Sequence, residues 1–138
     1  MRFTKLDGTY LVRLEKGEEV IDNLTRFLQT QGITAGWIEA LGALQEAELG
    51  YYNLHEKKYY YSTVDWVEVV SLVGNIALLE GKPMIHAHIA VGDSDFNLKG
   101  GHLKEAIVAA TMEVLIHAFN ATIERLYDEE IGLNLWEI

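Results

Sequence analysis

Residues 84–91 read MIHAHIAV, and this stretch has the strict alternation of a β-strand. Successive side chains of a strand point to opposite faces, so isoleucine, alanine and valine share one face while His86 and His88 share the other. In a helix the two histidines would diverge. The stretch therefore predicts a half-buried strand that presents two imidazoles side by side.

Outward from this strand, the chain reads as further strands around one helix. Apolar residues at helical spacing predict one main helix over about residues 18–31, ended by Gly32. Alternation and turn residues predict strands at 9–15, 35–44, 48–54, 58–64, 67–73, 76–79, 96–102 and 133–136. The glycine in the Leu41-Gly42-Ala43-Leu44 segment indicates a bulge or a close backbone approach.

Residues 105–119 fit two interpretations. Their alanines and length suit a helix, yet apolar residues also alternate with Thr111 and Glu113 as in a strand. With either interpretation, many strands and one clear helix predict an α+β fold with a largely antiparallel sheet.

Composition limits the class of protein. The 138 residues fit a single domain over 1–138, with 49% hydrophobic and 23% charged residues. There is no cysteine, no signal-peptide pattern and no run long enough for a membrane helix, so a cytoplasmic location without membrane contact is expected. The net charge of −10 disfavours direct DNA binding, which depends largely on Lys and Arg contacts to phosphates.

A third histidine can join the pair through hairpin geometry. If residues 93–95 form a three-residue loop, His86 lies opposite His102, and directly opposed residues share a face. A four-residue loop would instead place His102 opposite Ile85. The two glycines that precede His102 would leave open space beside its ring.

Three neutral imidazoles suit Zn²⁺ or a related divalent ion and leave a fourth position for water or a carboxylate. The predicted metal ligands are His86, His88 and His102. Glu113 is a candidate fourth ligand, or a candidate hydrogen-bond partner of a ligand, provided that its segment is a strand. The alternative is that the three are hydrogen-bonded histidines on a half-buried sheet face.

Five segments, in order and spread over nearly the whole chain, carry a family resemblance: RLEKGEE (13–19), LGAL (41–44), SLVGNI (71–76), PMIHAH (83–88) and GGHL (100–103). Together they resemble the plants-and-prokaryotes-conserved domain. The resemblance implies an antiparallel α+β domain assembled as a homotrimer, with 105–119 mostly strand, a glutamate at Glu113, and a metal held by histidines matching His86, His88 and His102.

Two functions are consistent with these features. The first is a trimeric assembly or binding module for protein partners or a small ligand, with a histidine metal site, in a family commonly labelled DNA-binding. The plant members carry an Arg-Gly-Arg-Pro AT-hook that is absent here. The second is a metal-dependent hydrolase or lyase, in which water on a His₃ ion would have a pKa near 7 and Glu113 would serve as general acid or base.

Overall fold

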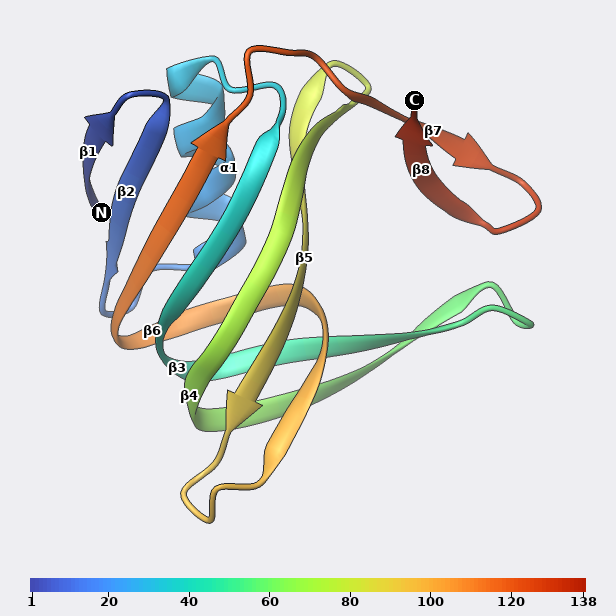
Figure 1. The fold of residues 1–138 in the computed structure, drawn as a ribbon. Helices are drawn as coiled ribbons and strands as arrows, with labels where there is room; N and C mark the ends of the chain where they lie inside the picture. The colour runs from blue at the N-terminus through green and yellow to red at the C-terminus, as the bar shows by residue number, and fades with distance from the viewer.

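Eight strands and one helix make up the chain in a computed structural model that describes residues 1–138 (Figure 1). All strands belong to one sheet, and every pairing is antiparallel except the short contact between β4 and β7. This confirms the α+β class and resolves 105–119 as strand. The elements are β1 (Arg2–Leu6), β2 (Thr9–Glu15), α1 (Val20–Gln31), β3 (Gly36–Asn53), β4 (Lys58–Leu79), β5 (Lys82–Gly92), β6 (Leu98–Ala118), β7 (Glu124–Asp128) and β8 (Leu133–Glu137).

Three long strands bend and serve two parts of the sheet. The first part of β6 pairs with β5 and with the end of β3, whereas its last part pairs with β2 and the start of β3. The end of β3 and the start of β4, residues 48–63, continue past the main sheet as a projecting hairpin, here called the arm (Figure 1). The β7–β8 hairpin lies on the same side of the molecule as the arm (Figure 1).

The helix α1 covers the core face of the main sheet (Figure 1). The Glu19 side chain caps its first turn by accepting from the Asp22 amide, and Gly32 ends it in the left-handed conformation. Leu24, Leu28 and further apolar residues of α1 join the buried cluster formed by the inner positions of the strands. No helix in the chain has the length and apolarity needed to cross a membrane.

The opposite side of the main sheet, here called the outer face, carries the alternate residues of each strand. Along one row, Glu39 of β3 opposes Val73 of β4, which opposes His88 of β5. In the next row, Trp37 opposes Asn75, which opposes His86. The histidine pair therefore lies at one end of two rows that cross the outer face.

The long strands differ from the shorter ones predicted. β3 is continuous through Gly42, where the register shifts, and β4 is continuous through Trp66, whose φ is 49°. Gly42 permits the close backbone approach predicted, since a Cβ there would collide with the Thr111 carbonyl. β1 and β7 were not predicted from alternation.

Candidate metal centre

Two neighbouring strands position the three histidines. His86 and His88 lie on β5 with their side chains on the outer face, and His102 lies near the start of β6. The observed register sets His88, rather than His86, opposite His102. The predicted pairing was therefore wrong by two residues, although all three side chains still share one face because strand alternation has a period of two.

The register follows from the loop between β5 and β6, which has five residues rather than three. Gly92 pairs with Leu98, and the Asp93 carboxylate accepts from the amides of Asp95 (3.0 Å) and Asn97 (2.9 Å). Phe96 adopts a positive φ of 63° within this loop. The Asp93 side chain thus stabilises a wider turn and moves the β6 register outward.

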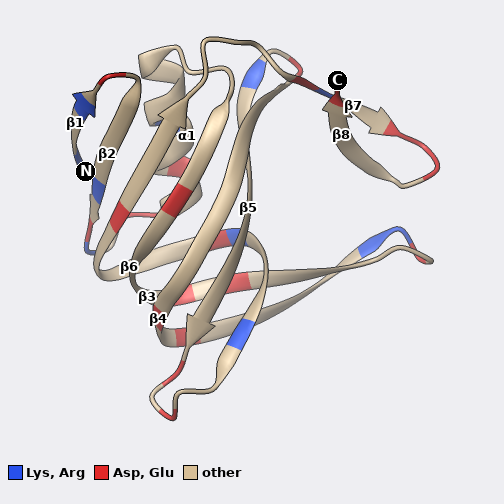
Figure 2. Ribbon diagram, in the orientation of Figure 1, with Lys and Arg blue, Asp and Glu red and all other residues tan.

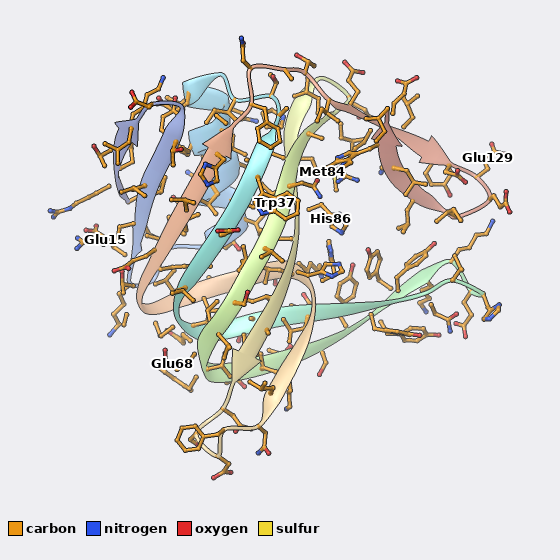
Figure 3. The ribbon with its side chains drawn as sticks, viewed as in Figure 1. Glu15, Trp37, Glu68, Met84, His86 and Glu129 are labelled. Carbon is orange, nitrogen blue, oxygen red and sulfur yellow. The ribbon has the colours of Figure 1, made fainter.

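The three imidazoles converge. The ring centroids of His86 lie 5.2 Å from those of both His88 and His102, and the His88 and His102 centroids are 5.9 Å apart. One nitrogen from each ring can be chosen so that all lie within 4.8 Å of one another. His86 projects from the outer face toward the space between the arm and the β7–β8 hairpin (Figure 3).

Burial and the proximity of neighbouring groups keep His86 and His102 neutral. Burial is the main cause that lowers the pKa of His86 to about 4, with contributions from His102, Arg125 and His88. Burial, followed by the proximity of His88, also lowers the pKa of His102. At neutral pH both rings therefore carry an unprotonated nitrogen, which is the state that binds a metal.

The donor set fits a divalent metal ion. Nδ1 of His102 is buried and has no hydrogen-bond partner, which is costly for a polar atom unless another group satisfies it. Zn–N bonds of about 2.0–2.1 Å at tetrahedral angles would separate the nitrogens by roughly 3.4 Å. Nitrogens already within 4.8 Å need only modest side-chain rotation to reach that spacing.

The prediction that Gly100 and Gly101 leave open space beside His102 was wrong. The two glycines instead bring neighbouring strands close together beside the site. A Cβ on Gly100 would lie 2.8 Å from the Ile89 carbonyl oxygen, and one on Gly101 would lie 2.6 Å from that of Gly50. The two glycines therefore allow the close packing of β6 against β5 and β3 that places His102.

Aromatic residues of the arm form one wall of the site. The Tyr59 ring lies 5.1 Å from that of His102 and stacks on Tyr61 at 5.5 Å. The Tyr52 hydroxyl donates to the Ile131 carbonyl (2.8 Å), which ties the arm to the loop of the β7–β8 hairpin. These contacts partly enclose His102, while His88 remains exposed.

Arg125 on β7 is a further residue at the site, and it was not singled out from the sequence. Its Nη2 donates to Asn75 Oδ1 (2.6 Å) and lies 3.5 Å from His86 Nδ1. Because guanidinium can only donate, this contact requires an unprotonated Nδ1 on His86. Arg125 lies 23 residues after His102, the nearest of the three histidines in the sequence, so no local pattern pointed to it.

Glu113 does not lie among the histidines of its own chain. It opposes Arg13 of β2 and Leu41 of β3, and it lines an outer-face cavity of about 770 Å³ together with Glu39. Three strand spacings of about 4.8 Å separate its strand segment from β5. This placement within one chain does not support its predicted role as a fourth ligand.

Solved structures of other proteins share this fold, and some of them are also similar to this chain in sequence. A structure of a candidate DNA-binding protein from Bacteroides thetaiotaomicron is 31% identical, covers 99% of this chain and 96% of its own, and has a TM-score of 0.96. A metal-containing protein from Archaeoglobus fulgidus is 32% identical, covers 100% and 99%, and has a TM-score of 0.88. Acetolactate decarboxylase from Bacillus subtilis subspecies spizizenii shares the fold alone, with 15% identity, coverage of 84% and 55%, and a TM-score of 0.59.

A curated relative and a family comparison complete these findings. The bifunctional protein GlmU from Synechococcus sp. (strain JA-3-3Ab) is 28% identical over 109 residues, which are 78% of this chain but only 16% of that protein. The Plants and Prokaryotes Conserved (PCC) domain family matches residues 1–120. The match includes all three histidines and ends before β7. The chain therefore belongs to the Plants and Prokaryotes Conserved domain family.

Proposed function

We propose that this protein is a binding module in which His86, His88 and His102 hold one divalent metal ion. Zinc is the ion that best suits three imidazole nitrogens and no thiolate. The observation that carries the proposal is the buried, unpartnered Nδ1 of His102 within a group of three converging imidazole rings. The metal-containing relative from Archaeoglobus fulgidus supports it.

The chain's own residues prepare the site for an ion. β5 and β6 hold the ligands on a rigid sheet, and burial keeps His86 and His102 unprotonated at neutral pH. The exposed His88 leaves the site open on one side. A bound zinc ion would supply a Lewis acid with one further coordination position.

Metal content tests this proposal. Elemental analysis should give about one zinc ion per chain, as expected for a site with three histidine ligands. This result is expected both for protein purified without added metal and for metal-free protein after incubation with zinc. His88→Ala should lose the ion, whereas His55→Ala, an exposed histidine in the turn of the arm, should keep it. Equal metal content in wild type and His88→Ala would contradict the proposal.

We also propose that the protein assembles as a homotrimer, as the family resemblance implies. Large apolar side chains on the outer face support an association surface, since extended apolar patches are uncommon on monomers. Leu11, Leu41 and Val73 are 42%, 59% and 43% exposed, and all line the outer-face cavity. Light scattering should give three times the chain mass, and a monomer mass at all concentrations would contradict the trimer.

A metal-dependent hydrolase or lyase is the second candidate, and the open side of the histidine cluster favours it. A site with three protein ligands and solvent access is the arrangement of catalytic rather than structural zinc. The fold shared with a decarboxylase is compatible with such chemistry. Zinc-loaded and metal-free protein should then differ in a panel of hydrolase and lyase substrates, and equal inactivity would exclude this candidate for those substrates.

Charge does not support direct duplex binding. Lys and Arg are dispersed over separate elements, with acidic residues between them (Figure 2), and the net charge is −10. Phosphate contacts strengthen as salt falls, so a DNA-binding chain should show its affinity at low ionic strength. We expect no duplex binding in a salt titration, and salt-dependent binding would overturn this expectation.

A further inference from the structure

Arg125 is the one charged residue buried in the chain, with 7% of its surface exposed. It lies on β7, in the hairpin beyond the residues that match the family. Its Nη1 donates to the Asn134 carbonyl (2.8 Å), and its Nη2 contacts Asn75 and His86. These partners leave Nε buried without any acceptor.

No anion compensates this buried cation. All six ion pairs of the chain involve other residues, so Arg125 has no carboxylate within 4.0 Å. Its guanidinium carbon lies 5.9 Å from the centre of the Trp136 ring, a contact that offsets only part of the desolvation cost. Buried charges in proteins are usually paired, because an unpaired one costs several kcal/mol.

The unpaired guanidinium lies directly beside the histidine cluster. Its Nη2 is 3.5 Å from His86 Nδ1, and no Asp or Glu belongs to the cluster. With a divalent ion on the three histidines, this part of the molecule would hold two cationic groups and no protein anion. An anionic ligand could satisfy both, since an Arg fork and an adjacent metal each favour carboxylate oxygens.

We propose that Arg125 and the histidine trio form one composite site for a small carboxylate, with the guanidinium as its specificity-determining group. The proposal rests on metal binding by the trio, and it goes further by naming the ligand class. The tyrosines of the arm and Trp136 of β8 supply apolar surface near these polar groups. The guanidinium comes from the β7–β8 hairpin, which follows the residues that match the family.

A purely structural role for Arg125 makes a different prediction. Its bonds to Asn134 and Asn75 join the hairpin to β4, so any substitution could lower stability. A structural role would not make carboxylate affinity depend on the guanidinium in a variant that remains folded. Ligand binding, measured separately from stability and metal content, distinguishes the two roles.

The test uses cobalt-loaded protein and acetate as the probe. Cobalt content is measured first for wild type, Arg125→Gln, Arg125→Lys and Arg26→Gln, the last being an exposed arginine of α1 that serves as the matched control. Acetate is then titrated while the visible cobalt spectrum and the heat of binding are followed, with neutral acetamide as the ligand control. We expect wild type and Arg26→Gln to bind acetate equally, and Arg125→Gln to bind it at least tenfold more weakly with unchanged cobalt content.

Each outcome separates this proposal from metal binding itself. Equal acetate affinity in wild type and folded Arg125→Gln, or no acetate binding by wild type, would overturn the composite site. If the protein takes up no cobalt, the proposed metal site fails, and calorimetric titration of the metal-free protein still tests whether acetate binding needs Arg125. If Arg125→Gln does not fold, Arg125→Lys carries the test, because it keeps the charge without the fork and should bind acetate more weakly than wild type.

Discussion

Replacing Gly101 with alanine should weaken metal binding at the proposed site without changing any of its three histidines. The added Cβ would lie 2.6 Å from the Gly50 carbonyl oxygen, about 0.8 Å closer than ordinary van der Waals contact. That oxygen belongs to the backbone of β3, so no flexible side chain can move aside. β6 must therefore shift next to His102.

The expected magnitude follows from this displacement. Overpacking of this kind costs about 1–3 kcal/mol, which for a chain of this size lowers the melting temperature by roughly 4–10 °C. Zn–N bonds have a narrow length range near 2.0–2.1 Å, so a shift of His102 by several tenths of an ångström weakens one of three ligands. We expect zinc affinity to fall at least tenfold. This is the lower end of the loss caused by mutating residues that hold metal ligands in position.

The assay is zinc competition against a chromophoric chelator, together with thermal melts of metal-free protein. Gly92→Ala is the matched control, because it lies in the same hairpin and its Cβ would meet only side-chain atoms at 3.6 and 3.7 Å. Wild-type zinc affinity in a folded Gly101→Ala, or an equal loss in Gly92→Ala, would refute the argument that close strand packing sets the position of His102.

Three further predictions concern stability. In metal-free protein, unfolded histidine takes up a proton below about pH 6.5, whereas His86 stays neutral until about pH 4; unfolding free energy should therefore fall across that window. Because the ring is half exposed, we expect a loss of about 1–2 kcal/mol, visible in urea titrations at pH 7 and 4.5 and reduced in His86→Gln. Glu19→Ala removes the helix cap and the acceptor of the Ala106 amide, so it should cost about 1–2 kcal/mol in the same titrations, with no change disproving the cap. Leu28→Ala empties a fully buried position and should cost about 2–5 kcal/mol, while a loss below 1 kcal/mol would show that the core collapses around it.

The shared face of the three histidines could be predicted from the sequence, but their pairing could not. Alternation alone sets which residues of a strand point the same way, and a register error of two residues leaves that unchanged. The pairing of His88 with His102 depends on a five-residue loop held by the Asp93 carboxylate. Three-residue and five-residue loops fit the same run of turn residues, so the sequence did not distinguish them.

Strand ends were harder to predict because, in this fold, a break in the alternation of apolar and polar residues marks a bend within a strand and not its end. Gly42 and Trp66 interrupt alternation, which normally indicates the end of a strand, yet β3 and β4 continue through them. Beyond Gly42, β3 has hydrogen-bonded partners on both sides, β4 and β6, whereas β4 on the arm side of Trp66 pairs with β3 alone. The bends turn the strands from the main sheet into the arm, and through the arm they place Tyr59 against His102.

The positive charge of Arg125 beside the histidines is the part of the site that sequence patterns predict least. Asn75, His86, His102 and Arg125 come from four different strands, and only the three-dimensional fold brings them together. The family match ends at residue 120, so it includes the histidines but not the guanidinium beside them. A chain with the same histidines and a different C-terminal hairpin would keep the three imidazoles and lose the buried cation. The histidine cluster therefore lies within the residues that match the family, whereas the proposed carboxylate site also needs Arg125 from the hairpin that follows them.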